Sequence, residues 1–310
     1  LRNGAIESLA HHLGLSPDQI EITGEVGLSY FLSLAGLLDE NKKLYSGAGD
    51  RSGVIATVRS HKGPSFEIPL SKDGRLNFAT TVFAPNSVLA FQLGNGESGA
   101  INELPNELPQ DLLIAVDATA TGARVNLPER WDSACFDSRS WDGPAGLAIV
   151  AINNAAQWKN PLPHISSVRR TYGTYSLPLL LASAVALENY RPSEASTREL
   201  TARFRTDISK ALPDALIAGE LEKSMAHLTS LVIPGTNGEE LLRELDRKGF
   251  AVDSGSACTA MNLQPSHVLS AMGMPTDGNI RIAIHTETTL EEVTGLVNAL
   301  VSAVRSQQQR

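Results

Sequence analysis

Two continuous apolar runs in the middle of the chain predict buried strands of a parallel sheet. Residues 112–116 (Leu-Leu-Ile-Ala-Val) end at Asp117, and residues 147–152 follow a Gly-Pro-Ala-Gly turn. Strands covered on both faces show such unbroken runs, whereas strands with one wet face alternate. Leu177–Tyr190, rich in Leu and Ala, and Arg198–Leu212 predict helices. We therefore expect an α/β layer whose ligands lie beyond the carboxyl ends of its strands.

The N-terminal part shows shorter elements. Apolar residues at helical spacing predict a helix over Ala5–Leu13, which Gly14 ends. A short strand is expected at Ile20–Ile22 and a buried helix at Leu28–Leu38. The run Val54–Val58 is rich in β-branched residues and predicts a strand.

The C-terminal part predicts a separate lobe of βαβ type. Thr229–Ile233 and Phe250–Val252 read as strands, and Asn237 can cap the helix between them. Residues 280–284 alternate between Ile and other side chains, as a half-buried strand does. Thr289, with Glu three residues later, forms a capping box for a final helix. At 310 residues, and with ~150 residues per domain as a guide, two domains are expected.

Composition and charge narrow the classes of function. The chain holds 26 Lys and Arg against 34 Asp and Glu, a net charge of −8, and without a basic block it offers nucleic acid no electrostatic footprint. Its longest apolar stretch, Leu177–Leu187, is shorter than the ~20 residues of a membrane span. Two cysteines cannot build a disulfide scaffold, and the histidines lack partners at metal-ligand spacing. We expect no nucleic acid, membrane or metal as a partner, and a cytoplasmic location.

The most specific segment is residues 252–259, Val-Asp-Ser-Gly-Ser-Ala-Cys-Thr, followed by Leu-Gln-Pro-Ser-His-Val-Leu at 263–269. It resembles the active-cysteine loop and following helix of the cysteine desulfurases, in the class V aminotransferase superfamily, and residues 279–282 (Asn-Ile-Arg-Ile) extend the similarity. The resemblance implies that Cys258 accepts sulfur as a persulfide. It also implies that Arg281 pairs with the substrate carboxylate, which suits a planar guanidinium with two parallel donors. Without the family resemblance, the sequence would be read more simply. Cys258 would be a small buried residue and Arg281 an ordinary solvated arginine.

The same resemblance implies pyridoxal 5'-phosphate (PLP) as the cofactor. In that family an Asp at the position of Asp117 pairs with the protonated pyridine nitrogen, although from the residues alone Asp117 equally caps the next turn. Thr174 is the last residue of the segment 170–174. This segment resembles the one that in the family reaches the partner subunit's phosphate, but it is one residue longer. Other positions differ from the pattern: Val26 stands at the phosphate-binding threonine and Asp50 at the ring-stacking histidine.

The Schiff-base position departs from the family most sharply. The family motif reads Ser-x-His-Lys-x-x-Gly-Pro-x-Gly, and residues 143–146 (Gly-Pro-Ala-Gly) fix the alignment. Ser140 then stands where the lysine belongs, with Arg139 at the histidine and Asp137 at the first serine. A serine hydroxyl can neither form an imine with PLP nor move the α-proton as an amine does. We therefore expect impaired PLP chemistry, with no covalent attachment of the cofactor.

The resemblance implies an α/β fold of the PLP-dependent transferase type (fold-type I). It implies a large domain with a mainly parallel sheet at residues 1–195, shortened at its N-terminus, and a small α/β domain at 196–310. It also implies a homodimer, or a heterodimer with an active paralogue.

Three functions stay open. The first, which we rank highest, is a degenerate desulfurase-like protein that accepts sulfur on Cys258 or regulates a paralogue. The second is an active PLP-dependent cysteine desulfurase or aminotransferase that mobilises sulfur from L-cysteine. The third is a structural dimerisation module without catalysis.

Overall fold

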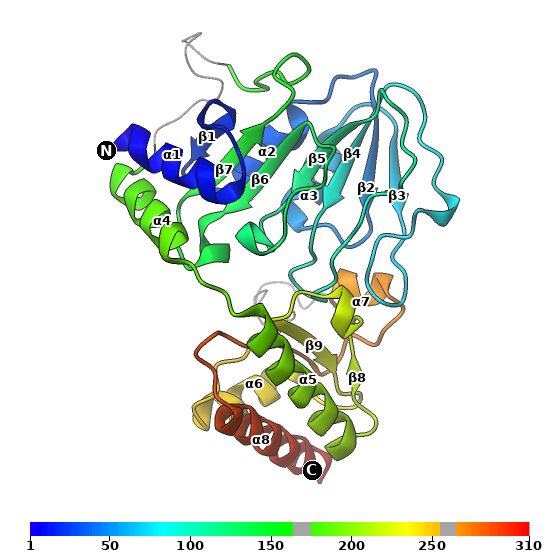
Figure 1. Ribbon diagram of the computed structural model, residues 1–310. Helices are drawn as coiled ribbons and strands as arrows, with labels where there is room; N and C mark the ends of the chain where they lie inside the picture. Colours follow the sequence, from blue (N-terminus) through cyan, green and yellow to red (C-terminus); the bar gives the residue numbers. More distant parts are fainter. Residues whose placement is uncertain (164–174, 255–264, 310) are drawn as a thin grey trace. The chain divides into compact units, whose positions relative to one another are not determined.

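The computed structural model describes residues 1–163, 175–254 and 265–309, and these divide into two compact units (Figure 1). The first unit comprises Leu1–Pro69, Asn77–Gly94 and Asn102–Arg191. The second comprises Leu70–Leu76, Asn95–Ile101 and Pro192–Arg310. Two short segments of the N-terminal half therefore belong with the C-terminal part of the chain.

A seven-stranded sheet organises the first unit. Its strands are β1 (Ile20–Thr23), β2 (Lys43–Gly47), β3 (Ser65–Ile68), β4 (Ser87–Gln92), β5 (Leu113–Asp117), β6 (Ser133–Asp137) and β7 (Ala148–Ile152), in the order β1-β7-β6-β5-β4-β2-β3. Strands β2 to β6 run parallel, whereas β7 pairs antiparallel with both β6 and β1. The expected α/β fold with a mainly parallel sheet is confirmed.

The direction of β7 corrects one expectation. Its apolar run forms a strand, as predicted, but the strand is antiparallel to its neighbours. All five residues of β7 are buried. An unbroken apolar run therefore reports burial on both faces, and it does not report strand direction.

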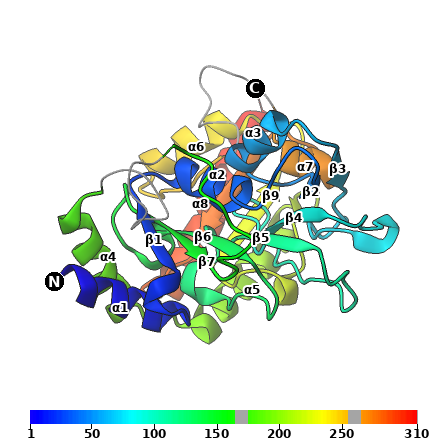
Figure 2. The same cartoon turned by 90° about the horizontal axis from the view of Figure 1, so that it is seen from above.

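In the part of this unit that the structure describes, the sheet is accompanied by the α-helices α1 (Arg2–Leu13), α2 (Val26–Ala35), α3 (Ser52–Ser60) and α4 (Leu177–Asn189). Viewed from above, α2 and α3 lie along one face of the sheet, and α1 and α4 lie side by side (Figure 2). Buried residues of α2 and α3, including Leu32, Leu34 and Val54, pack with Val88 and Val150 of the strands in one core cluster. This cluster holds α2 and α3 against the sheet.

Residues 54–58 form part of α3, so the strand predicted there is wrong. Val54 and Thr57 are buried and Val58 packs partly buried against the same cluster. This spacing of three and four residues is helical, and burial of that face outweighs the modest preference of β-branched residues for strands.

The second unit contains a three-stranded antiparallel sheet in the order β10-β9-β8. Its strands and helices are β8 (Leu216–Ile217), β9 (Leu228–Val232), β10 (Asn279–Ala283), α5 (Glu194–Ala211), α6 (Gly238–Arg247), α7 (His267–Ala271) and α8 (Leu290–Gln308). The antiparallel pairing shows that the expected βαβ lobe is wrong. Residues 250–252 form no strand: Phe250 and Val252 pack against the core cluster of this unit, and Asp253 makes only an isolated bridge with Arg281.

The predicted helix caps of this unit are confirmed. The Asn237 side chain accepts hydrogen bonds from the amides of Glu239 and Glu240 at the start of α6. Thr289 and Glu292 form the capping box of α8. None of the helices in the described ranges is both long and apolar enough to span a lipid bilayer.

Among the described residues, short 3₁₀ helices also occur in both units. They lie at Pro17–Gln19, Phe78–Thr80, Gly122–Arg124, Ser138–Trp141 and Leu221–Lys223. The one at Ser138–Trp141 directly follows β6 and contains Ser140.

Candidate active site

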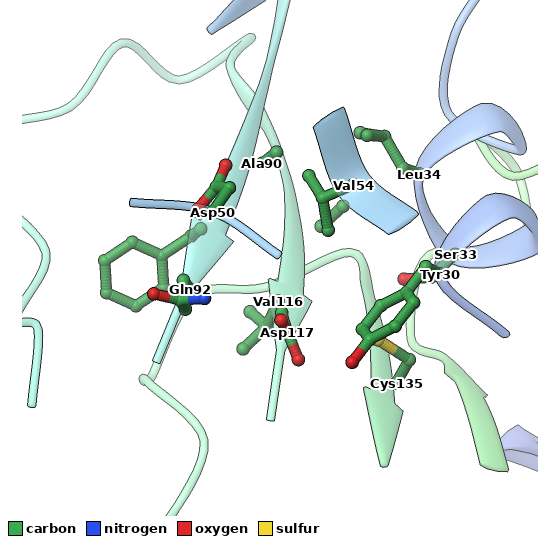
Figure 3. Close-up of a pocket in the computed structure, with 12 residues that line it drawn as sticks. Tyr30, Ser33, Leu34, Asp50, Val54, Ala90, Gln92, Val116, Asp117 and Cys135 are labelled. Carbon is green, nitrogen blue, oxygen red and sulfur yellow. The ribbon is translucent and has the colours of Figure 1, made fainter. Parts of the chain in front are cut away.

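Asp117 is the last residue of β5 and lies almost fully buried at the carboxyl edge of the parallel strands. Its Oδ1 accepts hydrogen bonds from the amide and the hydroxyl of Thr119, at 2.9 and 2.6 Å. The Thr119 hydroxyl lies 2.8 Å from that of Tyr30 on α2. Figure 3 shows Tyr30 and Asp117 facing the same small space. The edge of β5 and the second turn of α2 are thus joined by one chain of polar contacts.

The other oxygen of Asp117 faces a cation. Arg51, the residue before α3, places its Nε 3.8 Å from Asp117 Oδ2. Within the described residues neither of these two buried atoms makes a hydrogen bond. Burial lowers the pKa of the Arg51 guanidinium and the charge of Asp117 raises it, with a net rise. Burial also raises the pKa of Tyr30, so Arg51 is charged and Tyr30 neutral at neutral pH.

The N-terminus of α2 carries a carboxylate as its cap. Glu25 accepts hydrogen bonds from the amides of Gly27 and Leu28 at 2.7 and 2.6 Å. These amides belong to the first turn of the helix, whose partial positive charge attracts anions. Val26, at the position expected of a phosphate-binding threonine, is the first residue of the helix and has no side-chain oxygen.

Ser140 is partly buried and makes local contacts. Its hydroxyl donates to the Asp137 carbonyl at 2.6 Å, and its own carbonyl accepts from Arg124 at 2.5 Å. Gly122 approaches so closely that a Cβ there would collide with the Ser140 side chain. Arg139 forms an ion pair with the Asp137 carboxylate, with Nη2 and Oδ2 2.6 Å apart. Ser140, at the position expected of the Schiff-base lysine, is therefore hydrogen bonded through both its hydroxyl and its carbonyl.

Asp50 and Cys135 line a cavity of about 10 Å³ together with Asp117 and Tyr30, enough for about one water (Figure 3). Asp50 is 2% exposed and accepts a hydrogen bond from the Gly47 amide. Burial, with smaller contributions from nearby carboxylates, raises its pKa to about 8. Burial likewise raises the pKa of Cys135. Asp50 therefore belongs to the core beneath the edge of the sheet.

In the second unit Arg281 lies half-buried on β10 and is paired within the chain. Its Nη2 donates to the Asp253 carboxylate, and its Nη1 donates to the Gly96 carbonyl at 3.1 Å. The two residues also exchange backbone hydrogen bonds at 3.0 and 2.7 Å. The arginine expected to meet a substrate carboxylate thus meets a carboxylate of its own chain.

Asp117 ends strand β5, and Ser140 lies in the 3₁₀ helix that directly follows β6. Cys258 and Thr174 fall outside the described residues. Sequence reasoning missed the roles of Glu25 and Arg51. An acidic residue before an apolar helix was a usable signal for the cap, whereas nothing in the local sequence indicated that Arg51 lies beside Asp117.

Across the described ranges, no three His, Cys, Asp or Glu side chains gather in a way that could hold a metal ion.

The fold and the edge bearing Asp117 define a protein with the architecture of the PLP fold-type I transferases. The chain superimposes on a solved NifS-like protein with a TM-score of 0.84 at 20% identity, covering 98% of this chain and 87% of that one. A cysteine desulfurase from Thermococcus onnurineus NA1 gives a TM-score of 0.81 at 17% identity, with coverage of 98% and 84%. At these identities the similarity shows the fold alone.

Sequence comparison shows the family. Residues 55–296 match the family described as aminotransferase class-V. The chain is 23% identical to the cysteine desulfurase IscS of Methanosarcina thermophila over 329 residues, covering 98% of this chain and 81% of that protein. It is 34% identical to a Bacillus subtilis (strain 168) protein named IscS 1 over 266 residues, covering 79% and 70%. The chain belongs to the class V aminotransferase family and is cysteine desulfurase-like, and this membership implies PLP as the family's cofactor.

Proposed function

We propose that this chain is a cysteine desulfurase-like protein that has lost covalent PLP chemistry and that accepts sulfur on Cys258 from an active relative. The observation that carries the proposal is Ser140 at the position of the Schiff-base lysine. An imine needs a primary amine, and the same amine serves as the base that moves the substrate's α-proton. Its absence removes both the covalent anchor and the base.

The surroundings of Ser140 support this proposal. Its hydroxyl is already a donor to the Asp137 carbonyl, and Gly122 packs closely against its side chain. Around Asp117 the fit to PLP is equally poor, because Arg51 already faces the oxygen that a protonated ring nitrogen would need. The Glu25 carboxylate holds the helix amides that a phosphate would use. The described residues do not fit a covalently held PLP, so the reaction that we propose does not involve PLP on this chain.

The proposed reaction is a transfer of sulfur between thiols. The Cys258 thiolate attacks the outer sulfur of a protein persulfide on the partner. A new sulfur–sulfur bond forms at Cys258, the sulfur–sulfur bond of the donor breaks, and the donor thiolate leaves. The transfer involves no net oxidation or reduction, so it requires no further reagent. Its support is the sequence motif around Cys258.

A first experiment tests the loss of covalent cofactor chemistry. The protein is incubated with PLP, reduced with borohydride and examined by mass spectrometry, beside an active desulfurase as positive control. We expect no stoichiometric phosphopyridoxyl adduct on any single residue. One lysine modified to near completion would refute this part of the proposal.

A second experiment tests sulfur acceptance. An active desulfurase and L-cysteine generate the persulfide donor, and mass spectrometry locates the added sulfur after alkylation. We expect one extra sulfur on Cys258, its loss in Cys258→Ala and its retention in the matched control Cys135→Ala. An unlabelled Cys258 would refute the acceptor role. A Cys258 that is also alkylated no faster than Cys135 would favour a structural module.

One observation favours a second candidate, an active PLP enzyme that holds its cofactor without a covalent bond. Asp117 is retained, and its buried Oδ2 makes no hydrogen bond within the described residues. The test is incubation with L-cysteine and PLP. Formation of alanine and sulfide above the level of Cys258→Ala would support this candidate. Equal rates would leave the sulfur acceptor as the preferred function.

We further propose that the protein works in the cytoplasm as a homodimer or together with an active paralogue. Family membership supports an assembly of this kind. Mass photometry of the protein alone and mixed with an active desulfurase distinguishes the two arrangements.

A further inference from the structure

Two oppositely charged side chains of the first unit hold positions that an ionic ligand would otherwise use. The first is Glu25, the cap of the ten-residue helix α2. Free amides at a helix N-terminus form a ready site for phosphate groups. Here the amides of Gly27 and Leu28 donate to the two Glu25 oxygens, so the donors are engaged and the local charge is negative.

The second is Arg51, beside Asp117. Asp117 Oδ1 is satisfied by Thr119, and Oδ2 is the oxygen left for an incoming N–H group. The Arg51 guanidinium faces this oxygen at 3.8 Å. Its Nε is buried, although the side chain as a whole is 35% exposed and reaches solvent. A cationic ring nitrogen approaching Asp117 would therefore meet a like charge before it met the carboxylate.

The two positions belong to the same edge of the sheet. Tyr30 lies on the second turn of α2, and its hydroxyl contacts Thr119, which in turn bonds Asp117. Figure 3 shows Tyr30 and Asp117 on either side of one small space. A ligand with a cationic ring and a phosphate would have to displace both Arg51 and Glu25.

We propose that Glu25 and Arg51 act as built-in counter-ions that close this edge to phosphate-bearing pyridine ligands and stabilise the fold without any cofactor. The inference rests on the proposed function, because it explains how a family member can fold with its cofactor site closed. It adds two residues whose removal reopens the site.

The second unit shows the same arrangement on its own elements. The Asp253 carboxylate engages Arg281, the residue whose guanidinium would otherwise be offered to a carboxylate ligand.

The experiment uses pyridoxine 5'-phosphate, which has the ring nitrogen and the phosphate but no aldehyde. Isothermal titration calorimetry measures its binding to the full chain and to Glu25→Ala, Arg51→Met and the double variant. We expect no saturable binding to the unmodified chain at millimolar ligand. Each substitution removes a like charge and should tighten binding about tenfold, since a charge-assisted hydrogen bond is equivalent to about one to two decades of affinity. The double variant should gain about a hundredfold.

Asn237→Ala is the matched control, because Asn237 also caps a helix by accepting two amide hydrogen bonds. It should lose similar stability without gaining affinity. Glu25→Ser keeps a capping oxygen without the charge, and it should also gain affinity if Glu25→Ala unfolds. Tight binding to the unmodified chain would overturn the proposal, as would no gain in a folded double variant.

These outcomes are separate from those of the proposed function. Pyridoxine 5'-phosphate cannot form an imine, so its binding reports only on Glu25 and Arg51. The borohydride experiment reports only on whether the chain supplies an amine.

Discussion

Replacement of Asp50 by Asn provides the sharpest test of the electrostatics beneath the site. Asp50 is 2% exposed and accepts a hydrogen bond from the Gly47 amide at 2.8 Å. Burial raises its pKa to about 8, and the charges of Asp117 and Glu67 contribute to the rise. An unfolded Asp has a pKa of about 3.9. Between these values the folded protein holds a proton at Asp50 that the unfolded chain releases.

The sign of the effect follows from this difference in bound protons. Where the folded state binds more protons, its stability falls as pH rises, by about 1.4 kcal/mol per pH unit for one group. The contribution of Asp50 is therefore fully favourable below pH 4 and is lost as pH rises to about 8. From pH 5 to pH 7 the loss is about 3 kcal/mol. Asn has nearly the same shape, can accept the same hydrogen bond and does not titrate.

Asp50→Asn should therefore stabilise the protein by about 3 kcal/mol more at pH 7 than at pH 5, relative to the unmodified chain. Urea unfolding followed by tryptophan fluorescence measures this difference. All three tryptophans, Trp131, Trp141 and Trp158, lie in the first unit and so report on the unit that contains Asp50. Asp18→Asn, a substitution of an exposed carboxyl in the same unit, is the control and should show a parallel profile. Parallel profiles for Asp50→Asn as well would refute the reasoning.

Three further changes test packing, thiol burial and capping. Trp158→Phe removes the hydrogen bond that the indole N–H donates to the Leu32 carbonyl at 2.9 Å. The free energy of unfolding should fall by about 1–3 kcal/mol in urea titrations. An unchanged unfolding midpoint would contradict this. Cys135 is 2% exposed, and burial raises its pKa. In Cys258→Ala, Cys135 should therefore react with iodoacetamide only after unfolding, as mass spectrometry would show. Rapid labelling of Cys135 in the native protein would argue against its burial. Thr289→Ala removes the cap of α8 and should cost about 1 kcal/mol, measured by thermal unfolding with circular dichroism; an unaltered melting curve would speak against the capping box.

Elements with a strong local signal were predictable. The buried strands β5 and β7 are formed by apolar runs, and α6 and α8 begin directly after capping residues. The errors at residues 54–58 and 250–252 arose where β-branched or apolar residues gave an ambiguous pattern. There, packing against the core decided between helix, strand and irregular backbone.

The sequence by itself carries the proposal that covalent PLP chemistry is lost. Whether a side chain can form an imine depends on residue type, and the motif at residues 143–146 aligns Ser140 with the Schiff-base lysine. The family was also within reach of the sequence motifs, and its mainly parallel sheet followed from the resemblance that they carry.

Only the tertiary structure decided which side chains lie beside Asp117 and Arg281. Arg51 meets Asp117 because β5 and the start of α3 come together at one edge of the sheet, although they are far apart in sequence. Likewise, Asp253 meets Arg281 through a bridge to β10. Such charge pairs depend on distances of a few ångströms, because electrostatic interactions fall with separation and with exposure to water. A linear pattern of residues carries no such distances.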